Sequence, residues 1–259
     1  RSATVFVGAA LSLAVLILLD ARRAAPIVRA RGASAVAAQD AAGNATHNAT
    51  HNASEPRGLV ILFALLDDVG MNDLVNSTDI AAATPYIHAL ARDGVALARY
   101  YAQACCTPGR AAILTGKYSW RTGMQYGNLF NDSPWGLSPG FELLPQTLQK
   151  LDYASHLVGK WDVGYYARDM WPRRRGFDTF FGMLGDAFDW TTHKGNLDYT
   201  AWSNKWTDLH EADANAYGYE GNYSTWLWGN RTVALVEAHA RDEAARTRGL
   251  FVHLGLDAV

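Results

Sequence analysis

The sequence is poor in cysteine and has almost no excess of charge of either sign. Its 259 residues include only two cysteines, and these are the neighbours Cys105 and Cys106. Adjacent residues are poorly placed for an unstrained disulfide, which excludes a disulfide-stapled scaffold. The formal net charge of -2 excludes a broad positive field of the kind that holds nucleic acid. No internal repeat is visible.

The composition is that of a folded globular protein. Hydrophobic residues make up 49% and charged residues 19%, which argues against disorder. The length suffices for one large domain with a buried core. Because the chain begins with Arg1 and ends at Val259 directly after an apolar run, we expect it to be a fragment of a longer protein.

Residues 1–20 contain an apolar stretch from Ala3 to Leu19, with Arg1 before it and Arg22 after it. The stretch is long for the core of a signal peptide and slightly short for a membrane-spanning helix. It predicts a cleaved signal peptide or a single membrane anchor. A buried core helix is the alternative.

Residues 21–57 have no apolar periodicity and are rich in Ala, Arg, Gly and Asn, which predicts a linker. N-glycosylation acceptor triplets stand in tandem in this linker and recur beyond it, at Asn44, Asn48, Asn52, Asn76, Asn131, Asn222 and Asn230. Together with the apolar segment they predict a glycoprotein of the secretory pathway that is lysosomal, extracellular or anchored on the lumenal side. The alternative is a low-complexity Ala/Asn run.

The folded part is expected over residues 58–259. Apolar runs predict buried strands at residues 59–66, 155–158 and 250–256. Caps and Thr-Pro starts predict helices at residues 85–93, 107–115 and 144–151, and an Ala-rich helix from Asn230 or Thr232 to about Arg246. Strands that alternate with helices indicate an α/β fold with a largely parallel or mixed sheet flanked by helices.

Asp67 and Asp68 stand directly after the first of these strands. Ligands of open α/β sheets bind beyond the carboxyl ends of the strands. Two adjacent carboxylates repel each other unless a cation offsets their charge, so the pair suggests a hard divalent ion. A solvated turn and helix cap is the alternative.

Cys106 begins the segment Cys106-Thr107-Pro108-Gly109-Arg110, at the start of a predicted helix. The helix dipole and the free amides of the first turn favour an anion there. Arg110 lies one turn into the helix and is able to reach back toward position 106. Cys105 is expected to be a small buried apolar residue.

The segment continues through residues 111–118 and Arg121-Thr122-Gly123, and the whole run closely resembles the sulfatase family. The resemblance covers most of residues 58–259 and implies the N-terminal part of an alkaline-phosphatase-like catalytic domain. In that family the motif cysteine is oxidised to formylglycine (3-oxoalanine), whose hydrate is the nucleophile. Only Cys106 has Pro two residues and Arg four residues downstream. The resemblance therefore implies that Cys106 is the modified and catalytic residue.

Further site residues follow from the same resemblance. Asp67 and Asp68 would bind Ca²⁺ together with the modified residue at 106, and Arg110 would hold the formylglycine hydrate. Residues 158–161 are similar to a second signature, whose lysine, here Lys160, contacts the sulfate group. Asp162 stands where the family has histidine, as a catalytic-site or substrate-binding residue. The family draws a second pair of metal ligands, a histidine and a lysine from sequence beyond Val259.

The segment from Arg173 to Gly182, followed by Asp189-Trp190 and His193, is similar to the arylsulfatase B-like branch. This implies hydrolysis of a sulfated carbohydrate or an aryl sulfate, and a formylglycine-generating enzyme as the maturation partner. The chain has 9 Trp and 12 Tyr, many of them between Tyr165 and Trp228. They suit a surface that faces carbohydrate, although ordinary core packing is the alternative.

Two other functions remain open from the residues alone. One is a metal-dependent phosphatase or phosphodiesterase of the same broad fold, although such a site would favour a hydroxyl nucleophile over cysteine. The other is a non-catalytic relative that binds sulfated glycans, which Asp162 suggests, because a carboxylate would repel a sulfate anion.

Overall fold

The computed structural model describes residues 3–7, 12–20, 58–70, 84–97, 100–195 and 206–257. The linker predicted at residues 21–57 lies outside the described residues, and so do the acceptors Asn44, Asn48, Asn52 and Asn76.

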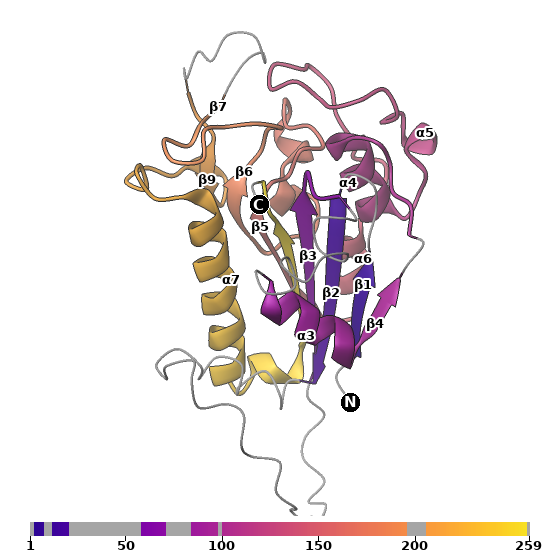
Figure 1. Ribbon diagram of the computed structural model, residues 1–259. Helices are drawn as coiled ribbons and strands as arrows, with labels where there is room; N and C mark the ends of the chain where they lie inside the picture. The colour runs from indigo at the N-terminus through magenta and orange to yellow at the C-terminus, as the bar shows by residue number, and fades with distance from the viewer. Residues whose placement is uncertain are drawn as a thin grey trace, which may run out of the picture.

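A mixed nine-stranded sheet forms the centre of the described part of the molecule (Figure 1). Its middle is parallel, as predicted, with β3 (Leu59–Asp67), β11 (Gly249–Gly255), β5 (Tyr153–Gly159) and β6 (Thr179–Met183) side by side. Antiparallel pairs join β2 (Ser12–Asp20) to β3 on one flank and β9 (Leu209–Glu211) to β6 on the other. In spatial order the strands are β10 (Ala214–Asn215), β9 (Leu209–Glu211), β6 (Thr179–Met183), β5 (Tyr153–Gly159), β11 (Gly249–Gly255), β3 (Leu59–Asp67), β2 (Ser12–Asp20), β1 (Ala3–Val7) and β4 (Val95–Leu97).

Helices cover both faces of the sheet, which explains why its central strands are apolar on both sides. On one face, Phe251 and its neighbours pack with residues of α4 (Cys106–Thr115) and α6 (Leu144–Gln149). On the other face, Val252 packs with Trp228 of α7 (Ser224–Arg241), which runs along the sheet in Figure 1. Consecutive strand residues therefore enter opposite cores.

Smaller elements complete the described structure. Helix α3 (Pro85–Asp93) packs against Leu66, near the end of β3, and against Val69, which follows it. The remaining elements are α5 (Ser119–Thr122), the 3-10 helices at Arg168–Met170, Pro172–Arg174 and Ala245–Thr247, and a two-stranded sheet of β7 (Lys194–Gly195) and β8 (Trp206–Thr207).

The strands and helices predicted in the folded part are confirmed, with one clear shift. Helix α7 begins at Ser224, before the predicted start at Asn230, and ends at Arg241, before the predicted end near Arg246. Asp257 accepts hydrogen bonds from Ser224 Oγ and Trp228 Nε1, which anchors the first turn from a distant strand end. Asp242 Oδ1 accepts hydrogen bonds from the backbone amides of Ala244 and Ala245, and this turn directs the chain away from the helix axis.

Residues 3–7 and 12–20 form β1 and β2, which join the sheet beside β3. The predicted strand at residues 59–66 is therefore not the first strand of the sheet, and the alternative of a buried core helix is wrong. Among the described residues, no helix has the length and the apolar character needed to cross a bilayer. A signal peptide or anchor at residues 1–20 stays a prediction.

Candidate active site

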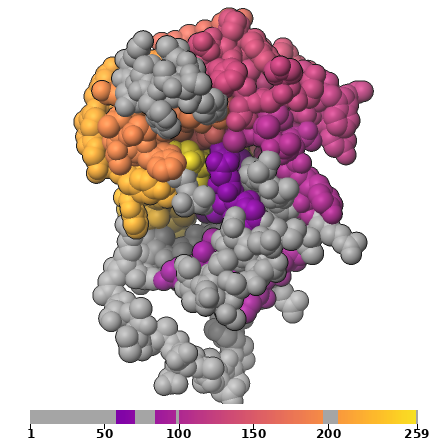
Figure 2. Space-filling model, turned by 45° about the horizontal axis from the view of Figure 1, so that its top comes forward, coloured from indigo at the N-terminus to yellow at the C-terminus, as the bar shows by residue number. Residues whose placement is uncertain are grey.

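A pocket opens at the carboxyl ends of the parallel strands β3, β5 and β11. Its volume is about 500 Å³. Figure 2 shows this end of the molecule, where the end of β3 (purple) and the end of the chain (yellow) lie between the magenta and orange segments. The lining includes Asp67, Asp68, Cys106, Asn128, Lys160, Met183, Asp186, Ala187, Phe188, Asp189, Trp190 and Asp257. The pocket therefore brings together most of the predicted site residues.

Asp67 is the centre of the polar contacts in the pocket. Lys160 Nζ lies 2.9 Å and an Arg110 terminal nitrogen 3.1 Å from Asp67 Oδ2. Cys106 Sγ donates to Asp67 Oδ1 at 3.1 Å. Burial opposes the charge on this carboxylate, but Arg110 and Lys160 outweigh it and hold the pKa of Asp67 well below its usual range. Asp67 is therefore an anion throughout the physiological pH range.

Cys106 is the first residue of α4, and its thiol faces the floor of the pocket. Cys105 precedes it in an extended conformation that turns the chain into the helix. Burial and the negative charge of Asp67 raise the pKa of the Cys106 thiol to about 12. A thiol in that state is a weak nucleophile, because the thiolate is the reactive form. The expectation that Cys105 is buried is wrong, because its side chain is exposed.

Lys160 enters the pocket at the point where β5 ends. Gly159 has φ +93°, and a Cβ at this position would collide with the backbone carbonyl oxygen of Gly255. That close approach lets the amide of Lys160 donate to the same carbonyl at 2.8 Å. Burial lowers the pKa of Lys160, but the nearby carboxylates, Asp162 foremost, more than compensate and raise it overall. Lys160 is therefore a fixed positive charge.

Asp162 lies behind Lys160 and is not among the residues that line the pocket. Its Oδ1 accepts from Thr107 Oγ1 at 2.7 Å. Among the described residues its Oδ2 has no hydrogen-bond partner, and it lies 3.6 Å from Lys160 Nζ and 3.9 Å from Arg110 Nε. Burial raises the pKa of Asp162 to about 7, although Lys160 and Arg110 counteract it. This carboxyl therefore takes part in the charge balance of the pocket from its buried side.

Asp68 follows Asp67 at the mouth of the pocket. It adopts φ +56°, a left-handed conformation that Asp tolerates better than most residues. Ligand atoms of Asp67, Asp68 and Cys106 lie within 4.8 Å of one another, as a shared ion would require. Calcium prefers six to eight oxygen ligands, so these residues fit one part of a hard-cation site.

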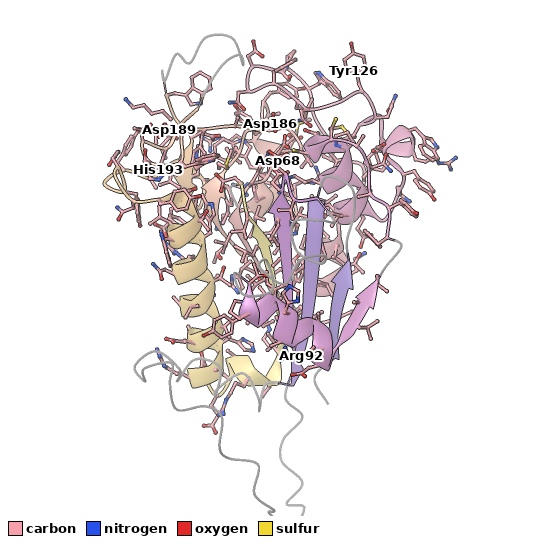
Figure 3. All side chains as sticks on the ribbon, viewed as in Figure 1. Asp68, Arg92, Tyr126, Asp186, Asp189 and His193 are labelled. Atoms are coloured by element: carbon pink, nitrogen blue, oxygen red, sulfur yellow. The ribbon has the colours of Figure 1, made fainter. Side chains whose placement is uncertain are left out.

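Asp186 is a site residue that the sequence analysis missed. Its Oδ1 lies 3.0 Å from Lys160 Nζ, so Lys160 lies between Asp67 and Asp186. Figure 3 shows Asp186 and Asp68 near each other at the same end of the sheet. Asn128 donates to Asp186 through Nδ2 and accepts from the amide of Thr107 through Oδ1. Its position in the sequence could have indicated this role, because Asp186 follows the end of β6 just as Asp67 stands at the end of β3.

Asp257 also lines the pocket, beyond the end of β11. Burial raises its pKa, while the hydrogen bond from Trp228 Nε1 works in the opposite direction. Asp257 thus connects the pocket to the first turns of α7.

Asn131, one of the predicted glycosylation acceptors, is engaged inside the protein. Its Oδ1 accepts from the amide of Asp186 at 2.9 Å, and its Nδ2 donates to the carbonyl of Ala187 at 3.0 Å. A glycan on Nδ2 would break this contact with the loop that carries Asp186. Asn222, in contrast, is exposed.

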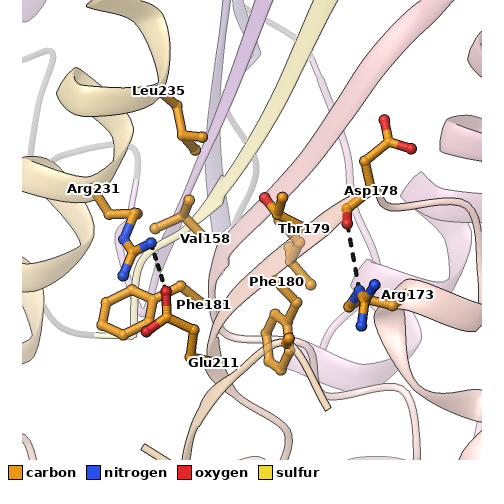
Figure 4. A pocket seen from close by; sticks show the side chains of 11 residues that line it. Val158, Arg173, Asp178, Thr179, Phe180, Phe181, Glu211, Arg231 and Leu235 are labelled. Carbon is orange, nitrogen blue, oxygen red and sulfur yellow. Dashed lines mark hydrogen bonds and ion pairs between the residues drawn. The ribbon is translucent and has the colours of Figure 1, made fainter. Parts of the chain in front are cut away.

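A second pocket, of about 240 Å³, lies beside β6 and faces α7 (Figure 4). Arg231 pairs with Glu211 at 2.8 Å and lies over the ring of Phe181. Arg173 Nε donates to the carbonyl of Asp178. This pocket shares none of the residues of the predicted catalytic site.

The chain is 36% identical to mouse arylsulfatase J over 206 residues, which cover 77% of this chain and 32% of that protein. It is 33% identical to mouse N-acetylgalactosamine-6-sulfatase over 215 residues, which cover 79% of this chain and 40% of that protein. The chain thus spans less than half the length of these relatives.

The fold is also that of solved sulfatases. The PsFucS1 sulfatase from Pseudoalteromonas sp. has a TM-score of 0.59 and 23% identity, over 80% of this chain and 44% of that structure. The sulfatase family profile matches residues 60–242, well over half of the chain. The match includes β3, α4 and the end of β5 that precedes Lys160, and these elements carry residues that line the pocket. On this evidence the chain belongs to the sulfatase family.

Proposed function

We propose that the protein of which this chain is a part hydrolyses sulfate esters of carbohydrates, with Cys106 converted to formylglycine as the nucleophile. The observation that carries the proposal is the convergence of Cys106, Arg110 and Lys160 on Asp67 at the floor of one pocket. Sulfate esters are anionic at all physiological pH values, so a site for them needs permanent cations. Arg110 and Lys160 supply two such charges.

The state of Cys106 supports a need for conversion. As a half-buried thiol that donates to Asp67, it is a poor nucleophile. An aldehyde at this position adds water to give two hydroxyls on one carbon. One hydroxyl oxygen attacks the sulfur, the bond from sulfur to the alcohol oxygen breaks, and the alcohol leaves with a proton. The second hydroxyl then loses its proton, the C=O bond re-forms and sulfate leaves.

The surrounding residues orient and neutralise these species. Arg110 reaches back from α4 to Asp67 and also donates to the carbonyl of Lys160 at 2.9 Å, which fixes its guanidinium at the start of the helix. In that place it is suited to hold the hydrate at position 106. Lys160 Nζ is a compact charge suited to the ester oxygens. Asp162 holds Thr107, the neighbour of the nucleophile, through its side-chain hydrogen bond.

We further infer that Asp67, Asp68 and residue 106 hold Ca²⁺, together with ligands from sequence beyond this chain. When bound, the ion supplies positive charge that polarises a sulfate oxygen and favours the ionised hydroxyl. Asp67 and Asp68 contribute the hard oxygen donors that this ion prefers.

The expected context is maturation in the secretory pathway, where a formylglycine-generating enzyme would act on Cys106. The tandem acceptor triplets support that compartment. A sulfated sugar is the favoured substrate, because the similar mouse protein named above is an N-acetylgalactosamine-6-sulfatase.

The test uses the full-length protein produced in secreting cells. Mass spectrometry of the peptide that contains residue 106 should show the aldehyde in place of the thiol, and the protein should release sulfate from a sulfated sugar. Cys106→Ala should abolish turnover, whereas Cys105→Ala, at the exposed neighbour, should retain it. A fully converted protein that hydrolyses no sulfate ester would contradict the proposal. Preferential hydrolysis of phosphate esters would favour a phosphatase instead.

A further inference from the structure

Trp190 lines the pocket but takes no part in the chemistry described above. Its side chain is 50% exposed, although it borders a pocket with a deeply buried floor. A large half-exposed aromatic ring beside a polar site is a feature of ligand-binding pockets rather than of a solvated loop.

The loop that carries Trp190 is held in place from several sides. Asp189 Oδ1 accepts from the amides of Thr191 and Thr192, which closes a tight turn around Trp190. The amide of His193 donates to the carbonyl of Asp189 at 2.8 Å. Figure 3 shows Asp189 and His193 close together on the side of the pocket nearer to α7. The loop is therefore preorganised before any ligand arrives.

Within the part of the chain that the structure describes, the ring packs against one aromatic side chain. Tyr223 meets Trp190 edge to face, with 6.4 Å between the ring centroids and an interplanar angle of 87°. The carbonyl of Trp190 accepts from the amide of Ser224 at 2.9 Å, at the start of α7. These contacts fix the position of the indole and leave half of its surface open to a ligand.

The remaining lining selects the kind of ring that fits. Asn128, Asp186 and Asp257 add amide and carboxylate groups to the lining of the pocket, together with Lys160 and Cys106. A pyranose presents an apolar C–H face to an aromatic ring and hydroxyls to polar walls. The hydroxyls of a pyranose can donate further hydrogen bonds to the carboxylate oxygens of Asp186 and Asp257, whereas an unsubstituted aryl ring has no donors to offer them.

We propose that Trp190 is a specificity-determining residue on which the pyranose ring of the substrate stacks while its sulfate group points to the floor of the pocket. This inference rests on the proposed function for the direction of the sulfate group. It adds the substrate contact that selects a sugar over a simple aryl ester.

The test measures binding separately from turnover. In full-length protein that carries Cys106→Ala, which cannot turn over substrate, calorimetry gives Kd for N-acetylgalactosamine 6-sulfate and for inorganic sulfate. Trp190→Ala should weaken binding of the sugar sulfate about fivefold to tenfold and leave inorganic sulfate unchanged. Trp190→Phe, which keeps an aromatic ring, should retain most of the affinity for the sugar sulfate. In protein with Cys106 intact, Trp190→Ala should raise KM for the sugar sulfate more than it lowers kcat.

Trp120 provides the matched control. It is 60% exposed and stacks on Tyr118 with 4.3 Å between centroids, but it does not line the pocket. Trp120→Ala should leave both dissociation constants unchanged. The inference would be overturned if Trp190→Ala weakened the binding of sugar sulfate and of inorganic sulfate equally. It would also be overturned if the substitution weakened the binding of a simple aryl ester, 4-nitrophenyl sulfate, and left that of the sugar sulfate unchanged. Sugar binding that depends on Trp190, together with no turnover by the protein that retains Cys106, would uphold the inference and reject only the proposed function.

Discussion

Lys160 lies among three carboxylates that would otherwise repel one another. Its Nζ is 2.9 Å from Asp67, 3.0 Å from Asp186 and 3.6 Å from Asp162. Buried charges of one sign are tolerated only when opposite charges compensate them. Lys160 therefore stabilises the folded pocket, in addition to the role proposed for it toward the sulfate group.

Lys160→Met should lower the free energy of unfolding by about 3–5 kcal/mol, because it leaves buried carboxylates uncompensated. Urea unfolding followed by circular dichroism measures this loss. Lys150→Met removes the exposed pair with Glu142 and should leave the urea midpoint unchanged. Equal effects of the two substitutions would show that Lys160 has no structural role.

Asp162 is placed to hold Thr107 rather than to touch substrate, because it is buried behind Lys160. Asp162→Asn retains an oxygen that accepts from Thr107 and should lower kcat by less than about tenfold. Loss of a general base typically costs about a hundredfold or more. Steady-state kinetics of the full-length protein between pH 5 and pH 8 distinguish the two roles. A larger loss would make the carboxylate the functional substitute for the family histidine.

At the scale of elements, the ends of β5 and α4 set the geometry of the site. The end of β5 carries Lys160 where the backbones of Gly159 and Gly255 meet. The start of α4 carries Cys106, with Arg110 one turn later. A small change at either end moves a charge relative to Asp67.

Gly159→Ala should destabilise the protein by about 2 kcal/mol or more, since the new Cβ would collide with a backbone carbonyl and φ is positive. It should also lower kcat, because Lys160 is the next residue. Thermal unfolding and turnover measure the two effects. A stable and fully active variant would mean that the strand end moves without displacing Lys160.

Gly109→Ala should have the opposite effect on stability. Gly109 lies within α4, and a Cβ there would meet no other part of the described structure within 4 Å, the neighbouring helix backbone aside. Alanine favours the helix by about 0.5–1 kcal/mol over glycine. The urea midpoint of the full-length protein should therefore rise. A lower midpoint would show that this turn of α4 needs the freedom of glycine.

At the scale of the whole molecule, the sheet keeps a histidine in its interior. His253 of β11 packs edge-on against Phe177 and Phe251 and beside Phe63. Burial, together with the charge of Arg110, lowers the pKa of His253 to about 3. The folded protein therefore keeps this ring neutral under conditions in which an unfolded chain would protonate it.

This difference predicts a loss of stability in acid. Between pH 6.5 and pH 3 the unfolded state binds the proton and the folded state does not, so stability falls as the pH falls, by up to about 1.4 kcal/mol per pH unit. His253→Leu should reduce this slope and leave the slope above pH 7 unchanged. Urea unfolding midpoints of the parent protein and of His253→Leu, measured across this pH range, test the prediction. An unchanged acid slope would assign acid unfolding to other groups.

The sequence by itself determined the family and the parallel centre of the sheet, and it predicts Cys106 as the nucleophile. These follow from short-range patterns, because an apolar run, a Thr-Pro helix start and the Cys106 motif are each contained in a few neighbouring residues. For the same reason it located Asp67, Arg110 and Lys160, each of which lies at the end of a strand or the start of a helix.

Only the tertiary structure decided which charges meet. Asp186 joins Lys160 across 26 residues, and Asp162 pairs with Thr107 across 55. No local pattern marks such contacts, because they arise when separate strand ends are brought to one edge of a sheet. The start of α7 at Ser224 and the place of Trp190 beside the pocket have the same origin, since both depend on long-range packing.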